Sequence, residues 1–188
     1  MKLYPILMAM FCVLPGVFRG QEKVNPDAQL VADFQKCVAD YVKLHQAAHS
    51  RLPALKPTNS TAVIDHHEHA LAREIREMRR SAQPGDIFTP AIAQEFRRLL
   101  GIAMQGTEKH EIRKSVQDTQ PVRGRPLRVN ESYPAGAPLP TVPPSLLLNL
   151  PPLPPEVEYR IVGTDLILHD VEANLIVDWI PDAISRRT

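Results

Sequence analysis

Five of the seven histidines lie close together in the sequence, and imidazole is the side chain here best suited to chemistry. They are His45, His49, His66, His67 and His69. His45 and His49 are four residues apart and would share one face of a helix. If two helices form an antiparallel hairpin across Leu52–Ser60, His67 approaches the same end. Two imidazole nitrogens on one helix and a third from its neighbour could bind Zn²⁺, Ni²⁺ or Cu²⁺.

The metal hypothesis competes with a structural interpretation of the same residues. Asp65 or Glu68 could supply a further ligand, or accept a hydrogen bond from a ligating ring. The sequence has neither HExxH nor the Cys/His ligand spacing of a zinc finger, which favours the structural interpretation. In that interpretation His66 and His69 are exposed at a helix start, and the other three histidines are partly buried and hydrogen-bonded. A transition-metal cofactor belongs only to the first interpretation.

Other chemistry has little support in the sequence, and an enzyme is the least favoured class. GxSxG, CxxCH, P-loop and dinucleotide glycine patterns are all absent, and eight glycines leave little room for a phosphate-binding loop. His169 and Glu158 are predicted cross-strand neighbours, which is ordinary sheet pairing. Cys12 lies in the N-terminal apolar run, so its removal would leave only Cys37. We interpret Cys37 as a small buried residue on a helix.

The first twenty residues predict export. Lys2 precedes an apolar run, Leu3–Phe18, which has the length of a signal peptide and is short for a spanning helix. We expect cleavage of this segment near Gly20. The alternative is that it stays attached as an anchor, which would be the only contact of the protein with a membrane. A formal net charge of +1 gives no reason to expect nucleic acid. We therefore expect a periplasmic or secreted protein whose partner is an envelope protein or a second copy of itself.

The rest of the chain divides by composition into three parts. Residues 21–118 are helical by periodicity, 119–155 are proline-rich, and 156–188 form a β-meander and tail. The expected helices are Pro26 to about Leu52, Ser60 or Thr61 to about Ser81, and Pro90 to about Met104, with a further short one over 107–116. In the second helix Ile64, His67, Leu71, Ile75 and Met78 form the apolar stripe. The proline-rich part should be extended, with Leu146, Leu147, Leu148, Leu150 and Leu153 against the protein surface.

The segment Val157–Ile180 predicts three antiparallel strands. A turn at Gly163 pairs Tyr159 with Leu168, and a four-residue loop over 171–174 pairs Leu168 with Val177. The same register pairs Leu166 with Trp179. One face then carries Tyr159, Ile161, Leu166, Leu168, Leu175, Val177 and Trp179, to be covered by the proline-rich part. The other face carries Ile167, Ile176 and Ile180, which could serve as a partner surface.

Two stretches, QPGDIFTPAIAQEFRRLL and YPAGAPLPTVPPSLLLNLPPLPPEVEYRIVGTDLILHDVEANLIVDWI, resemble a group of uncharacterised exported bacterial proteins with a proline-rich segment and a C-terminal β-hairpin. The resemblance implies an export address and a shared architecture, and no activity. More remotely, the terminal hairpin is similar to that of small periplasmic proteins of the nickel/cobalt-homeostasis family. That likeness covers about 25 residues and implies no ligands here.

The expected fold is thus α+β: about three N-terminal amphipathic helices, an extended proline-rich crossover and a C-terminal three-stranded antiparallel meander. The expected function is that of an exported, non-catalytic binding or structural protein of the periplasm or cell envelope. A periplasmic transition-metal binder using His45, His49 and His67 is the second hypothesis, and an enzyme of unknown class is the third.

Overall fold

The structure is a computed structural model that describes residues 26–104, 127–133, 142 and 144–184. The predicted signal peptide, the short helix over 107–116 and residues 119–126, 134–141 and 143 of the proline-rich part lie outside these residues. The described elements, in chain order, are α1 (Pro26–His49), α2 (Thr61–Met78), α3 (Pro90–Ala103), α5 (Pro144–Leu147), β1 (Val157–Val162), β2 (Asp165–Asp170) and β3 (Leu175–Ile180). The three strands form one antiparallel sheet in the order β1-β2-β3, which confirms the predicted α+β class. Within the described part of the chain, no helix combines the length and apolarity needed to cross a membrane.

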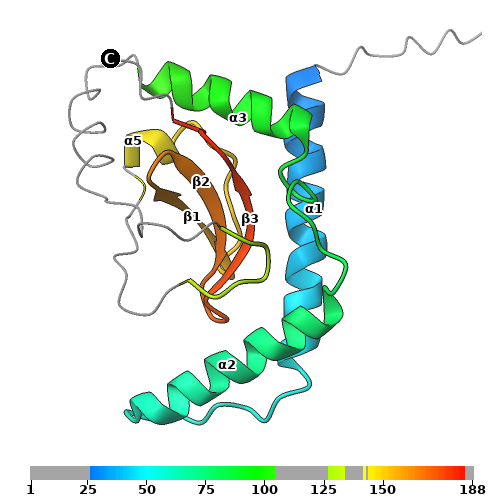
Figure 1. The fold of residues 1–188 in the computed structure, drawn as a ribbon, viewed down its shortest axis with the longest axis vertical. Coiled ribbons are helices and arrows are strands. Elements are labelled where there is room, and N and C mark those ends of the chain that lie inside the picture. Colours follow the sequence, from blue (N-terminus) through cyan, green and yellow to red (C-terminus); the bar gives the residue numbers. More distant parts are fainter. Residues whose placement is uncertain (1–25, 105–126, 134–141, 143, 185–188) are drawn as a thin grey trace, which may run out of the picture.

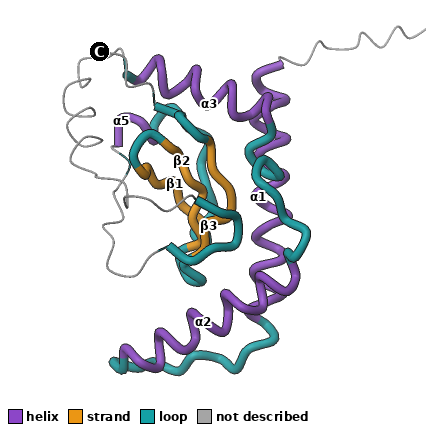
Figure 2. Tube along the Cα trace, in the orientation of Figure 1, coloured by secondary structure: helices purple, strands orange, loops and turns teal. Residues whose placement is uncertain are grey.

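The three long helices frame the sheet. Figure 1 shows α1 alongside the sheet, with α3 at one end and α2 at the other; α1 contacts both of its neighbours. The predicted helix starts are confirmed. Ser60 is the N-cap of α2, and the Thr89 hydroxyl accepts a hydrogen bond from the Ile92 amide at the start of α3. Figure 2 shows the loop between α2 and α3 running back along α1.

The first turns of α2 are exposed, contrary to the predicted stripe. Leu71 and Ile75 are fully buried, but Ile64 is 43% exposed. Burial along α2 begins at His67, and residues 61–66 are all exposed. The 3.6-residue period marks a helix face correctly, but it does not say how far the neighbouring elements extend along that face.

The first hairpin has the predicted register. Val162 pairs with Asp165, and Tyr159 pairs with Leu168. Gly163 has φ 64°, a conformation that glycine adopts without steric cost, so the tight turn needs glycine at this position.

The second hairpin contains a β-bulge that the sequence did not reveal. Our predicted register placed Leu168 opposite Val177. It also placed Leu166 opposite Trp179. Both pairs are wrong by one residue, because the register shifts between Leu168 and His169 and β3 carries one extra residue. The observed pairs are Leu166 with Ile180, Ile167 with Trp179, Leu168 with Asp178, His169 with Ile176 and Asp170 with Leu175.

The bulge places the residues that follow it, from Asp178 to Ile180, on the faces opposite to those predicted. Ile180 is fully buried in the main core, on the face where we expected Trp179. Trp179 instead lies half-buried on the second face, beside Ile167 and Ile176. The predicted placement of Trp179 on the same face as Tyr159 is therefore wrong.

Asp178, which follows the bulge, anchors the loop between α2 and α3. Its buried carboxylate accepts hydrogen bonds from the backbone N–H groups of Gly85 at 3.0 Å, Ile87 at 2.9 Å and Phe88 at 2.8 Å. Three backbone donors converge on one charged acceptor, which satisfies groups that would otherwise be buried without partners. The bulge thus points a carboxylate, rather than an apolar residue, toward this loop.

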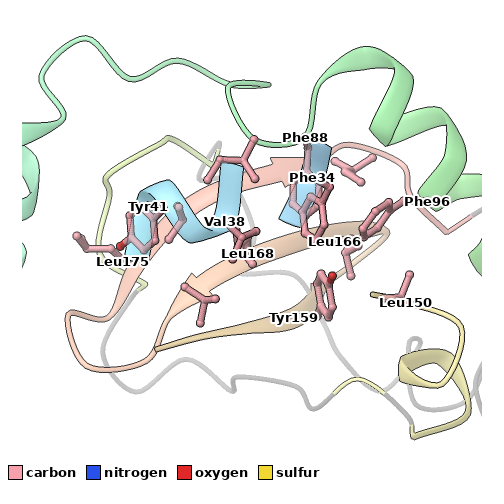
Figure 3. Packing of buried hydrophobic residues seen from close by; sticks show 14 of the residues in the cluster. Phe34, Val38, Tyr41, Phe88, Phe96, Leu150, Tyr159, Leu166, Leu168 and Leu175 are labelled. Atoms are coloured by element: carbon pink, nitrogen blue, oxygen red, sulfur yellow. The ribbon is translucent and has the colours of Figure 1, made fainter. Parts of the chain in front are cut away.

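The main core lies between the helices and the first face of the sheet. Figure 3 shows Phe34, Phe88, Phe96 and Tyr159 packed together; the Phe34 and Phe96 ring centroids are 4.9 Å apart. The aromatic rings come from α1, the α2–α3 loop, α3 and β1, so this cluster joins the helices to the sheet.

The described end of the proline-rich part covers the same core, although it is not wholly extended. Its Pro144–Leu147 segment forms a single helical turn, α5, because proline at the first helical position fits helical φ. Leu146 and Leu150 are buried and Leu153 packs against them, as predicted. Leu148 is 86% exposed and Leu147 40% exposed, contrary to expectation.

The second face of the sheet is covered by residues 127–133. Backbone hydrogen bonds join this segment to β3, including Asn130 N–H to the Ile176 carbonyl at 2.8 Å and Ile176 N–H to the Glu131 carbonyl at 2.9 Å. Leu127 and Tyr133 pack on Ile167, Ile176 and Val162. Ile167, Ile176 and Ile180 are at most 2% exposed, so they are packing residues and cannot form the open partner surface we predicted.

Candidate metal centre

The histidines of α1 and α2 meet the sheet at the β2–β3 turn, residues 171–174. This turn lies at the end of the sheet nearest α2 (Figure 1). His45 and His49 are on the last turns of α1, where their spacing places them on one face. His67 lies where α2 becomes buried, and Glu172 is in the β2–β3 turn. Three separate elements therefore bring their side chains to one point.

Glu172 lies at the centre of this cluster, with its carboxylate close to all three histidines. One carboxylate oxygen, Oε1, lies 3.3 Å from His49 Nε2 and 3.4 Å from His67 Nε2. The other, Oε2, lies 3.2 Å from His45 Nε2. Donor atoms of His49, His67 and Glu172 all lie within 4.8 Å of one another, and the two imidazole centroids are 5.6 Å apart. These three side chains have the separation of ligands around a single ion.

His67 is the member of the cluster whose polar atom lacks a partner. Its Nε2 atom is buried and makes no hydrogen bond. Its 3.4 Å distance to Glu172 Oε1 is short enough for an ion pair, but the contact is not a hydrogen bond. A buried nitrogen without a partner is costly, and each such atom in a folded protein calls for an explanation.

His45 differs from the other two because both of its ring nitrogens are bound. Its Nδ1 lies 2.7 Å from Oδ2 of Asp170, which also accepts from the Tyr41 hydroxyl at 2.5 Å. The Ala173 N–H donates to Oδ1 of Asp170 at 2.8 Å. His45 is only 3% exposed and Asp170 is fully buried, so this chain of contacts fixes the ring beside Glu172.

The same contacts shift the pKa values of His45 and Asp170. Burial alone would lower the pKa of His45, but its hydrogen bond and charge interaction with Asp170, together with Glu172, leave that pKa raised. Burial alone would raise the pKa of Asp170, but hydrogen bonds from His45, Tyr41 and Ala173 leave it lowered. Asp170 therefore stays ionised inside the protein, and His45 is held between two carboxylates.

The structure brings His45, His49 and His67 together and leaves the other candidates outside. His66 and His69 are exposed, and His69 Nδ1 bonds to the Asp65 carbonyl at 2.6 Å. Glu68 is not at the cluster, since its Oε1 accepts from the Asn174 side chain at 3.2 Å. The carboxylates of the site are Glu172 and Asp170, which our reading of the sequence missed.

The sequence feature that could have indicated these carboxylates is the acidic segment DVEAN, residues 170–174. It was interpreted as turn chemistry because nothing local shows that the loop meets two helices more than a hundred residues away. His169 bonds Glu158 at 3.1 Å and Asn174 at 3.1 Å, which is the sheet pairing expected for it.

Two imidazoles and one carboxylate form a ligand set typical of transition-metal sites with an open position. Comparison of the chain with protein-family models, curated proteins and solved structures finds no match. The two resemblances noted in the sequence therefore stay predictions, as do the exported location and the envelope or self-association partner.

Proposed function

We propose that this chain is an exported binding protein whose ligand is a transition-metal ion, held by His49, His67 and Glu172. The observation that carries the proposal is the unpartnered, buried His67 Nε2, which lies within 4.8 Å of two further donor atoms. A metal ion would give this nitrogen the partner that it lacks. His45, the third histidine of the original hypothesis, would hold Glu172 from behind.

Two of the three distances between donor atoms suit a tetrahedral ion, and the third, between His49 and His67, is at most 4.8 Å. Metal–ligand bonds of about 2.0–2.1 Å place neighbouring ligand atoms of a tetrahedron about 3.3–3.4 Å apart. Glu172 Oε1 lies 3.3 Å from His49 Nε2 and 3.4 Å from His67 Nε2. Zn²⁺ has this geometry with imidazole and carboxylate ligands, and Ni²⁺ and Cu²⁺ accept the same ligands.

A structural role for the same contacts is the competing explanation, and metal titration separates the two. The metal-free protein would be titrated with Zn²⁺ by isothermal calorimetry at pH 7.5. We expect one ion per chain for wild type, and loss of that binding in His67→Ala and Glu172→Ala. His66→Ala is the matched control, because His66 is an exposed histidine on the same helix.

Two outcomes would contradict the proposal. The first is no uptake of Zn²⁺, Ni²⁺ or Cu²⁺ by the folded wild-type protein. The second is uptake that His67→Ala leaves unchanged while circular dichroism shows the variant to be folded. The exported location is tested separately, by measuring the mass of the protein from the periplasmic fraction, where loss of about the first 20 residues is expected.

A further inference from the structure

We propose that the metal ion in this centre keeps a coordination position open to solvent, and that this position takes up a small anionic donor. The inference rests on the proposed metal-binding function and goes beyond it, because it assigns a second ligand to the same site. It also separates two roles for His45: a fourth metal ligand, which would close the site, and a positioning residue, which leaves it open.

Among the residues that the structure describes, only three protein donors converge. His49, His67 and Glu172 each supply an atom of the group within 4.8 Å, and His45 is not part of that group. The His45 ring instead bridges two carboxylates, with Nδ1 on Asp170 at 2.7 Å and Nε2 on the outer oxygen of Glu172 at 3.2 Å. Zn²⁺ takes at least four ligands, so three protein donors leave a position for another molecule.

The open position faces water because buried side chains enclose the cluster on its inner side only. His45 and His67 have side chains 3% and 9% exposed, whereas His49 and Glu172 are 44% and 42% exposed. The two buried rings form the inner wall and the two half-exposed groups form the rim. Val171, next to Glu172, is 51% exposed, so no described residue covers the turn at that point.

The charge of the centre selects the kind of donor. A divalent ion carries two positive charges, and Glu172 is the only anionic group among the three donors. One formal positive charge is therefore left on the ion and its ligands, facing the solvent side. Small anions with one oxygen or nitrogen donor, carboxylates above all, match that charge and the single open position. Such a carboxylate can come from a free organic acid or from the side chain of a second protein chain.

Cobalt(II) in place of zinc provides the test, because its visible spectrum reports on the number and kind of its ligands. The full-length folded protein would be loaded with one equivalent of Co²⁺ and titrated with azide, then with acetate. We expect each anion to change the spectrum with a single saturable phase, and His66→Ala to behave like wild type.

His45→Gln decides between the two roles of His45. A positioning residue predicts that this variant binds Co²⁺ about 10- to 100-fold more weakly and still binds azide once loaded. A fourth ligand predicts the reverse pattern, in which wild type ignores azide up to 100 mM and only His45→Gln responds; that pattern would overturn the inference while leaving metal binding intact. If Co²⁺ does not bind at all, the proposed function fails and this inference fails with it.

Sedimentation velocity at two protein concentrations separates the sources of the donor. A protein that stays monomeric with Co²⁺ supports a free anion as the natural ligand. A Co²⁺-dependent dimer that azide dissociates also supports the open position, and assigns its donor to a second copy of the chain.

Discussion

Asp170→Asn is the sharpest test of how the fold supports the metal centre. The substitution keeps the size of the side chain and removes its charge. Asp170 accepts from Tyr41 and from the Ala173 N–H, and pairs with His45, all inside the protein. The amide oxygen of asparagine can still accept one or two of these hydrogen bonds, but the charged partner of His45 is lost.

The expected cost follows from those contacts. Breaking a buried charge pair by removing one partner typically costs about 3–5 kcal/mol. Because part of the hydrogen bonding survives in asparagine, we expect the free energy of unfolding to fall by about 2–4 kcal/mol. His45 then holds Glu172 less firmly, so metal affinity should fall by about 10- to 100-fold. Asp40→Asn is the control: Asp40 is exposed on the same helix as His45, so this substitution should leave the Zn²⁺ affinity unchanged and lower the stability much less than Asp170→Asn does.

Urea denaturation of the metal-free protein measures the stability, and calorimetry with Zn²⁺ measures the affinity. A stability loss below about 1 kcal/mol, with unchanged Zn²⁺ affinity, would refute the view that Asp170 supports the site through His45. If Asp40→Asn lowers the stability and the Zn²⁺ affinity as much as Asp170→Asn does, the cause is a general effect of charge. That result would also refute the role of Asp170.

Acid adds an independent check on Asp170. The pKa of Asp170 is lowered from its usual 3.8 in the folded protein, so the ionised group stabilises the fold fully above about pH 4. This stabilisation is lost as the pH falls through the lowered pKa, and asparagine has no such loss. The stability gap between wild type and Asp170→Asn should therefore narrow as the pH falls below 3.8, the ordinary pKa of an aspartate. A constant gap below that pH would contradict the assigned charge.

Three further perturbations test the rest of the structure. Asp178→Ala leaves three backbone N–H groups of the α2–α3 loop and that of Trp179 without their acceptor, and it should cost about 3 kcal/mol or more by urea denaturation. A loss under about 1 kcal/mol would contradict the anchoring role of Asp178. Leu168→Ala should cost about 2–5 kcal/mol, because Leu168 is fully buried, while Leu148→Ala at 86% exposure should be nearly neutral. Asp40, between Lys36 and Lys43, should titrate by NMR with a pKa of about 2 that rises in high salt; an ordinary pKa would contradict the two ion pairs.

Local rules recovered the elements of the fold. Pro26 and Pro90 open helices through the fixed φ of proline, and Thr89 caps α3 with its hydroxyl. Ser60 takes the N-cap position of α2 without a side-chain hydrogen bond. Gly163 marked the first hairpin turn, and its register followed from the turn itself. Each of these signals lies within a few residues of the structure that it predicts.

The errors arose where distant parts of the chain meet. The bulge in β3 places Asp178 under the backbone of the α2–α3 loop, about ninety residues earlier in the sequence, and alternation of apolar residues alone could not show it. Trp179 was assigned to the wrong face for the same reason. At the candidate site, helical spacing suggested that His45, His49 and His67 lie close together. Glu172 was missed because its role depends on a tertiary contact.

The large sequence separation between His45 and Glu172 bears on when the centre forms during folding. These two residues touch across 127 positions of sequence, so the contacts that hold Glu172 in place belong to the most non-local class, which forms slowly. A growing chain that has made α1 and α2 holds the histidines but not the carboxylate between them. The complete centre exists only after the last hairpin has docked. If the centre binds a metal ion as proposed, its ligands are all in place only when folding is complete, so the ion would be acquired in the compartment where folding finishes.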